Sequence, residues 1–291
     1  MFHGSMVALV TPMLPDGSLD FPALSSLIEY HIAAGTAAIV VVGTTGESAT
    51  VDYAEHCRLI GHAVDVAAQR IPIIAGTGAN STSEAITLTR CAMEKGADAC
   101  LLVTPYYNKP TQEGLFQHYQ AIARAVPIPL ILYNVPGRTA VDMLPETTLR
   151  LSSIANIIGI KEASGSVDRI KQIIAACGDR MDVYSGDDDL AMECMLNGAK
   201  GVISVTANVA PKQFSDMCKA SIAGDRPKAE LLHNQLIAVT NAMFVESNPI
   251  PVKWAVALQG HIQAGIRLPL TSLSEQHQPM VRDALAGANL L

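Results

Sequence analysis

Short apolar segments alternate with amphipathic segments eight times along the 291-residue chain. The apolar segments predict strands at residues 5–10, 37–42, 71–75, 99–103, 130–133, 157–161, 182–184 and 201–205. Helical patterns lie between them, for example at residues 53–68, 83–95 and 113–124. Eight successive strand–helix units favour a closed parallel barrel over an open sheet. We therefore predict an α/β fold, a (β/α)8 TIM barrel.

Three glycines support this alternation, because each ends a helical pattern shortly before a predicted strand. They are Gly35, Gly96 and Gly198. Glycine readily adopts the left-handed conformation that ends many helices and turns the chain back. Hydrophobic residues make up 49% of the chain but aromatic residues only 4%, so alanine, valine, isoleucine and leucine dominate. Such residues suit parallel strands that are covered by helices.

The strand pattern ends near Gly224, and the rest of the chain has helical patterns. Pro249-Ile250-Pro251 predicts an elbow between two of these helices. We therefore divide the chain into a barrel, residues 1–224, and a C-terminal helical extension, residues 225–291. The leucine-rich faces of the extension are equally consistent with oligomerisation and with packing on the barrel.

Charge and composition exclude several classes of protein. The formal net charge is -7 and no basic run occurs, so we expect no nucleic-acid partner. No signal peptide is evident, and no apolar stretch approaches the roughly 20 residues that span a bilayer. We therefore expect a cytoplasmic protein. The cysteines lack Cys-x-x-Cys spacing and are predicted to be buried, reduced thiols: Cys57, Cys91, Cys100, Cys177, Cys194 and Cys218.

A lysine closes the sixth predicted strand, although the preceding residues 157–160 are all apolar or glycine. In a TIM barrel the active site lies at the carboxyl ends of the strands. Lys161 could pair with Glu162 or extend to the barrel mouth, because buried ammonium groups usually have a partner. Alternatively, it is a Schiff-base lysine, because a desolvated amine suits attack on a carbonyl.

Polar residues also close the second and fifth strands. Tyr133 ends an apolar strand and is either a core anchor or a proton shuttle beside a lysine imine. Arg138 follows in a Pro-Gly loop and is either a surface charge or a bidentate clamp for a carboxylate. Thr44 and Thr45 lie between two glycines, which forms either a tight turn or a site for a carboxylate.

Other polar clusters are interpreted structurally. Asp187, Asp188 and Asp189 are predicted to cap the helix that follows them, because acids favour helix N-termini. His56 and His62 are six residues apart and face different sides of their helix, so they do not form a metal pair. We predict no metal site.

The motifs together resemble those of a known family. They occupy residues 43–48, 104–114, 132–139, 159–165, 185–188 and 244–254. Over essentially its whole length, the chain resembles the pyruvate-dependent class I aldolases, the family that contains N-acetylneuraminate lyase and dihydrodipicolinate synthase. The double threonine Thr44-Thr45 and the arginine Arg138 are similar to the synthase branch.

The resemblance implies roles for four catalytic residues. Lys161 would form an imine with pyruvate, and Tyr133 would donate and accept protons. Tyr133 would act in a relay with Thr44 and with Tyr107 of a neighbouring subunit. No metal or organic cofactor would be needed, because the lysine serves as the electron sink.

The resemblance also implies the substrates and their binding residues. Thr45 would hold the pyruvate carboxylate, and Arg138 would hold the carboxylate of L-aspartate-4-semialdehyde. Backbone groups of Gly186 and Ile203 would help to shape the pocket. The product would be 4-hydroxy-tetrahydrodipicolinate, which opens the diaminopimelate route to lysine.

A tyrosine that crosses between subunits implies at least a dimer, and the family is commonly a homotetramer built as a dimer of dimers. The resemblance further implies an L-lysine effector site. Its residues would be Ser48, Ala49, His56, Asn80, Glu84 and Tyr106. Lysine-sensitive relatives often carry histidine where this chain has Tyr53, which bears on the strength of feedback.

Two other functions remain open on the sequence. A sister aldolase acting on a sugar acid would share the Schiff base, but Arg138 argues against it. A catalytically silent barrel that binds carboxylates would share the fold. The joint presence of Lys161, Tyr133, Thr44 and Arg138 argues against that second alternative.

Overall fold

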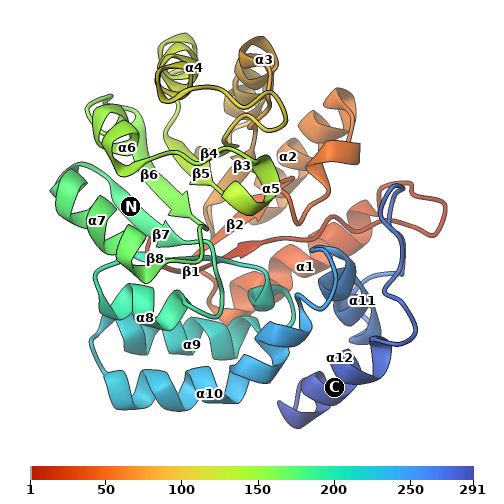
Figure 1. The fold of residues 1–291 in the computed structure, drawn as a ribbon. Helices are drawn as coiled ribbons and strands as arrows, with labels where there is room; N and C mark the ends of the chain where they lie inside the picture. The colour runs from red at the N-terminus through yellow and green to blue at the C-terminus, as the bar shows by residue number, and fades with distance from the viewer. Residues whose placement is uncertain (1) are drawn as a thin grey trace.

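The computed structural model describes residues 2–291, and eight parallel strands close into a barrel in sequence order (Figure 1). The strands are β1 (Gly4–Ala8), β2 (Ala38–Val41), β3 (Ile73–Gly76), β4 (Ala99–Val103), β5 (Leu130–Asn134), β6 (Ile157–Glu162), β7 (Asp182–Ser185) and β8 (Gly201–Ser204). The barrel closes where β1 pairs with β8, with Gly4 opposite Gly201. All eight predicted strands and the predicted fold class are confirmed.

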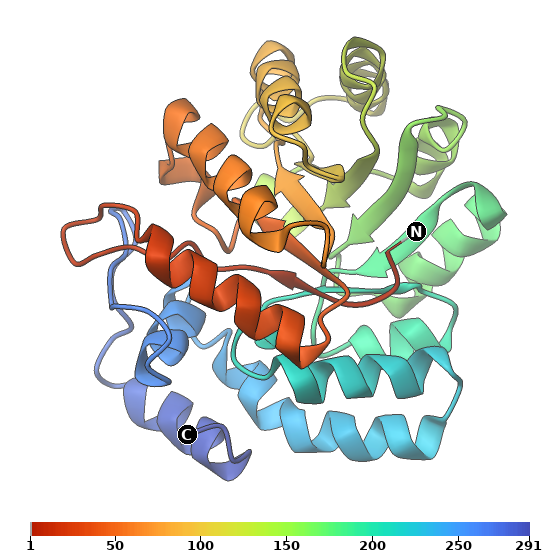
Figure 2. The same ribbon diagram turned by 180° about the vertical axis from the view of Figure 1, so that it is seen from behind.

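Helices surround the barrel in both views (Figures 1 and 2). They are α1 (Phe21–Ala34), α2 (Tyr53–Ala67), α3 (Thr82–Glu94), α4 (Gln112–Ala125), α5 (Pro136–Thr139), α6 (Pro145–Leu151), α7 (Val167–Cys177), α8 (Ala191–Leu196) and α9 (Pro211–Ile222), with short 3-10 turns η1 (Ser48–Thr50), η2 (Gly178–Arg180) and η3 (Thr206–Asn208). At the start of α2, Asp52 and Glu55 form a capping box. Gly35, Gly96 and Gly198 all have positive φ, as their positions before the strands require.

Strand alternation creates two apolar layers. One cluster fills the barrel interior and includes Met6, Val40, Ile74, Leu101, Ile131, Tyr133, Tyr184 and Ile203. The larger cluster lies between the strands and the helices and includes Leu130, Leu132 and Ile160. Successive side chains of a strand point to opposite faces. Lys161 therefore points into the barrel, whereas Glu162 points toward the helices.

The C-terminal extension packs on the barrel. It contains α10 (Arg226–Ala242), α11 (Ile250–Leu258) and α12 (Gln278–Gly287). Both ribbon views show α10 running alongside α9. Leu236, Val252 and Val281 belong to the same apolar cluster as the outer face of the barrel strands. The predicted elbow lies where Pro249 precedes α11.

Two cysteines correct the prediction of six reduced thiols. Cys57 on α2 and Cys91 on α3 are joined as a disulfide, with their Cα atoms 6.1 Å apart. The other four cysteines are buried and free. Spacing in the sequence could not reveal the pair, because the two residues lie 34 positions apart on different helices. Within residues 2–291, no helix combines the length and apolar character that a membrane crossing requires.

Candidate active site

Lys161 lies in the barrel interior at the carboxyl end of β6 and is only 5% exposed. It is paired in register with Tyr133 of β5, and its Nζ lies 4.3 Å from the centroid of the Tyr133 ring. Within residues 2–291 Lys161 forms no ion pair with a carboxylate. The amine is therefore held against the negative face of a phenol ring rather than against an acid.

Glu162 is excluded as the partner of Lys161 by its position on the opposite face of β6. Asn134 Nδ2 donates hydrogen bonds to both carboxylate oxygens of Glu162, at 3.2 and 3.1 Å. Burial raises the pKa of Glu162 to about 7. This pair joins β5 to β6 directly behind Tyr133 and Lys161, which stabilises their register.

A cavity of about 160 Å³ surrounds the amine at the mouth of the barrel. Six of the eight predicted catalytic and substrate-binding residues line it: Thr44, Thr45, Tyr133, Arg138, Lys161 and Gly186. Gly186 is required by space, because a Cβ atom there would lie 2.9 Å from Lys161 Cε. The cavity has room for a molecule of a few heavy atoms beside Nζ.

The chemistry of the lining suits an anion. Arg138 supplies positive charge, and the buried Thr45 supplies a hydroxyl. Asp187 also lines the cavity, and its Oδ2 accepts the backbone N–H of Gly165 at 2.8 Å. Burial raises the pKa of Asp187. A small carboxylate with a carbonyl would meet a nucleophilic amine and two groups that bind its charge.

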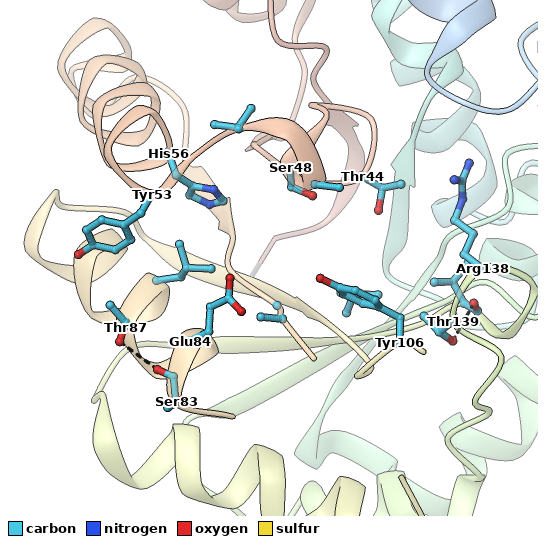
Figure 3. A pocket seen from close by; sticks show the side chains of 17 residues that line it. Thr44, Ser48, Tyr53, His56, Ser83, Glu84, Thr87, Tyr106, Arg138 and Thr139 are labelled. Atoms are coloured by element: carbon cyan, nitrogen blue, oxygen red, sulfur yellow. Dashed lines mark hydrogen bonds between the residues drawn. The ribbon is translucent and has the colours of Figure 1, made fainter. Parts of the chain in front are cut away.

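A second, larger cavity of about 590 Å³ adjoins the first, and Figure 3 shows the side chains that line it. Five of the six predicted effector residues line it, together with Tyr53: Ser48, Ala49, His56, Glu84 and Tyr106. The sixth residue, Asn80, does not line the cavity, but its Nδ2 donates to the backbone oxygen of Tyr106 at 3.2 Å. Thr44, Val135 and Arg138 line both cavities and form their common wall.

His56 has a structural contact within this second cavity. Its Nε2 lies 2.7 Å from the backbone oxygen of Gly76, and burial lowers its pKa. His62 lies 2.8 Å from the hydroxyl of Ser25 on α1. The two histidines face different neighbours, as their spacing predicts.

Two predicted residues do not line the 160 Å³ cavity. Ile203 is fully buried in the barrel interior, in the same apolar cluster as Tyr133. Tyr107 is 89% exposed and adopts a positive φ of 73°. Positive φ is uncommon for a tyrosine. Its predicted place in a relay across subunits stays a prediction.

The acidic run corrects a prediction. Leu190, not an aspartate, precedes α8, and no side chain caps that helix. The Oδ2 atom of Asp188 instead accepts hydrogen bonds from the backbone N–H groups of Val205 and Thr206 and from the Thr206 hydroxyl. Asp188 therefore stabilises the turn after β8. No group of three metal-ligating side chains is positioned for a metal within residues 2–291.

The sequence patterns did not predict that the C-terminal extension contributes residues to the catalytic cavity. Phe244 and Asn248 both line the catalytic cavity. In α11, Lys253 forms a buried ion pair with Glu47 of the loop after β2. Residues 244–254 carry one of the motifs that resemble the family. The rule that active-site residues end the strands assigns no role to a segment outside the barrel.

The fold and the cavity define a class of protein, namely (β/α)8 barrels with a buried lysine in a small cavity at the strand ends. The Dihydrodipicolinate synthetase family model matches residues 1–288. The 4-hydroxy-tetrahydrodipicolinate synthase of Thioalkalivibrio sulfidiphilus is 62% identical over 290 residues, which cover 100% of this chain and 99% of the relative. That of Alkalilimnicola ehrlichii is 60% identical, with both chains fully covered.

Solved structures agree with this assignment. A chloride-inhibited dihydrodipicolinate synthase from Acinetobacter baumannii, complexed with pyruvate, superposes with a TM-score of 0.99 at 57% identity, covering both chains fully. A synthase from Cyanidioschyzon merolae with lysine bound has a TM-score of 0.96 at 38% identity, covering 100% of this chain and 99% of the other. The chain belongs to the dihydrodipicolinate synthetase family.

Proposed function

We propose that this enzyme is a lyase that condenses pyruvate with L-aspartate-4-semialdehyde and yields 4-hydroxy-tetrahydrodipicolinate. One observation carries the proposal: Lys161 is a buried amine without a carboxylate partner in residues 2–291, inside a small cavity lined by Thr45 and Arg138. Relatives with about 60% identity over the whole chain carry the name of this activity. The reaction would belong to lysine biosynthesis, which agrees with the cytoplasmic location predicted from the sequence.

The first half of the reaction uses Lys161 and Tyr133. The Nζ of Lys161 attacks the ketone carbon of pyruvate, and the phenol of Tyr133 protonates the departing oxygen, which leaves as water. The Thr45 hydroxyl binds the pyruvate carboxylate. The Tyr133 phenolate then takes a proton from the methyl group of the protonated imine, whose nitrogen accepts the electron pair, and this gives the enamine and restores the phenol.

The second half joins the aldehyde. The enamine carbon attacks the aldehyde of L-aspartate-4-semialdehyde, whose carboxylate binds Arg138. The amine of the same substrate then displaces Lys161 from the imine, closes the ring and restores the free lysine. Arg138 lines both the catalytic cavity and the larger cavity, which supports this role.

The exposure of Tyr107 supports the proposal that two subunits complete each site. An aromatic side chain that is 89% exposed suits an interface better than solvent. We propose a homotetramer arranged as a dimer of dimers, with Tyr107 reaching the relay of Tyr133 and Thr44 in a neighbour. Tyr107→Phe should slow turnover without unfolding the barrel. Unchanged turnover would remove Tyr107 from the mechanism.

The 590 Å³ cavity supports the proposal of an L-lysine effector site. The Glu84 carboxylate suits an ammonium group, and the Tyr106 hydroxyl suits a carboxylate (Figure 3). Calorimetric titration with L-lysine should show binding that Glu84→Gln weakens. Tyr53→His tests whether the tyrosine sets the strength of inhibition.

Borohydride trapping tests the proposed function directly. Reduction in the presence of pyruvate should leave a pyruvate-derived adduct on the peptide that contains Lys161, as read by mass spectrometry. Lys161→Ala is the control and should give no adduct. A folded wild-type enzyme without the adduct would disprove the Schiff base. Comparison of L-aspartate-4-semialdehyde with sugar-acid aldehydes then distinguishes the synthase from a sister aldolase.

A further inference from the structure

Asn248 lies just before α11, in the C-terminal extension, and lines the catalytic cavity. Its side chain is almost fully buried, with 7% of the residue exposed. No barrel strand carries it, so the rule that active-site residues end the strands does not identify it. Its contacts nevertheless connect it to both residues that the proposed function assigns to substrate carboxylates.

The first contact reaches Thr45. Asn248 Nδ2 donates a hydrogen bond to Thr45 Oγ1 at 3.0 Å. The second contact reaches Arg138, whose Nη2 donates to the backbone oxygen of Asn248, also at 3.0 Å. One residue of the extension therefore holds the threonine after β2 and the arginine of α5.

The direction of the first bond determines what Thr45 can bind. A hydroxyl has one hydrogen to donate and two lone pairs that accept. Asn248 occupies an accepting position, and no other group of residues 2–291 bonds Thr45 Oγ1. The hydroxyl hydrogen is therefore free to be donated to a group inside the cavity. A carboxylate accepts that hydrogen, whereas an ammonium group cannot.

The oxygen of the Asn248 side-chain amide also bears on the orientation of this side chain. Asn248 Oδ1 is buried and has no hydrogen-bond partner within residues 2–291. Buried polar atoms without partners are rare. If the amide were reversed, its oxygen would face Thr45 and take up the hydroxyl hydrogen. The side chain thus has one orientation that favours a bound carboxylate and one that opposes it.

We propose that Asn248 is a positioning residue that orients the Thr45 hydroxyl toward the pyruvate carboxylate and holds Arg138 through its backbone oxygen. This inference rests on the proposed function, because it needs Thr45 to bind pyruvate. The ion pair between Lys253 and Glu47 anchors the extension to the same loop that carries Thr45, which keeps Asn248 in place.

Steady-state kinetics of four variants test the inference: Asn248→Ala, Asn248→Asp, Thr45→Val and the double variant Asn248→Ala/Thr45→Val. Asn248→Ala should raise the half-saturating pyruvate concentration about tenfold, the scale of one hydrogen bond to a charged group. Asn248→Asp should raise it further, because its carboxylate accepts the Thr45 hydrogen and repels pyruvate. The half-saturating concentration of the aldehyde should change less, because the backbone oxygen that holds Arg138 remains.

The double variant separates positioning from general loosening. If Asn248 acts through Thr45, Asn248→Ala should add no further rise in the Thr45→Val background. A further tenfold rise in the half-saturating pyruvate concentration in that background would overturn the inference. An unchanged half-saturating pyruvate concentration in Asn248→Asp would also overturn it. Asn248→Ser provides a smaller change if the alanine variant fails to fold. It should also raise the half-saturating concentration of pyruvate without changing that of the aldehyde.

Borohydride trapping with limiting pyruvate gives an independent measure of occupancy at Lys161. The variants should need correspondingly more pyruvate to reach half of the maximal adduct. Equal pyruvate requirements in the wild type and in Asn248→Ala would overturn the inference while leaving the proposed function intact. Absence of any adduct in the wild type would instead refute the proposed function.

Discussion

Two lysines are buried to nearly the same degree in different regions of the molecule, and their surroundings differ. Lys161, in the catalytic cavity, is 5% exposed, and Lys253, where the extension meets the barrel, is 4% exposed. Lys253 forms an ion pair with Glu47, and the second carboxylate oxygen of Glu47 accepts the backbone N–H of Arg267 at 3.1 Å. Lys161 forms no ion pair within residues 2–291, and its Nζ lies 4.3 Å from the centroid of the Tyr133 ring.

The difference separates a lysine held in an ion pair from one that we propose to be the nucleophile. Burial lowers the pKa of Lys253, while the Glu47 carboxylate beside it opposes that shift. An ammonium ion with such a partner is satisfied and has no reason to react. Lys161 forms no such ion pair within residues 2–291, which is consistent with the nucleophilic role proposed for it. Burial of a lysine is thus uninformative until its neighbours are known.

Replacement of the reactive lysine should have the largest effect on activity. We expect Lys161→Met to reduce kcat by at least about 10³-fold, the scale found when an enzyme loses its nucleophile. The melting temperature should stay equal or rise, because the methionine buries no amine. Calorimetry and turnover of the same preparation measure both. A large loss of stability would show that Lys161 also supports the fold.

Replacement of the structural lysine should show the reverse pattern. Lys253→Met leaves the Glu47 carboxylate buried without its partner, which should lower the free energy of unfolding by about 3–5 kcal/mol. Urea denaturation measures the loss, and borohydride trapping should still modify Lys161. Glu47→Gln/Lys253→Met should recover most of the stability. A single variant as stable as the wild type would contradict this assignment.

Glu162 offers a test on the opposite face of the reactive strand. Its pKa rises from 4.5 to about 7 on folding, so its contribution to stability is complete below pH 4.5 and is lost as the pH rises through 7. At about 1.36 kcal/mol per pKa unit, this loss is up to about 3 kcal/mol. Glu162→Gln should therefore flatten the decline in unfolding free energy between pH 4.5 and 7.5.

The same variant also sharpens the comparison of the lysines. Glu162 faces Asn134, and beyond it lie the charged groups of Asp142 and Arg169. Glu162→Gln should leave the pyruvate adduct on Lys161 intact at pH 7.5. Loss of the adduct in a folded variant would mean that Glu162 influences the amine after all.

The smallest effect is expected at Arg267, which binds both oxygens of Glu55 at 2.6 Å and the backbone oxygen of Thr50 at 2.8 Å. Arg267→Lys loses the bidentate contact, and since both side chains are partly exposed we expect a loss of about 1 kcal/mol. The loss should shrink in 1 M salt. Denaturation at two salt concentrations measures it, and a salt-independent loss would indicate packing rather than charge.

Patterns within short segments of the sequence predicted the strands and the residues at the strand ends. Strand periodicity located β1 to β8, and the rule for strand ends brought Lys161, Tyr133 and Thr44 to one cavity. Both inferences need only the residues within a segment and the geometry of a barrel. The assignment to this family agrees with the comparisons, because most of the motifs lie at those strand ends.

Contacts between distant segments could not be predicted in this way. Asn248 reaches Thr45 across 203 positions, and Asp188 bonds Thr206 rather than its own helix. The interpretation of Asp188 as a local cap was wrong because acids near helix starts are common, and only the folded chain shows which N–H groups lie nearby. The pairing of Cys57 with Cys91 likewise depends on how two helices pack.

The distance between Glu47 and Lys253 along the chain has a consequence for synthesis. The two residues are 206 positions apart. At about 5–20 residues per second, the ribosome makes Glu47 roughly 10–40 s before Lys253. Until then the nascent barrel lacks both the Lys253 ammonium group that pairs with Glu47 and the part of the catalytic cavity that Asn248 lines. We expect stalled chains that end before residue 244 to be cleaved readily by protease and to trap no pyruvate, so that reactivity begins only when translation is nearly complete.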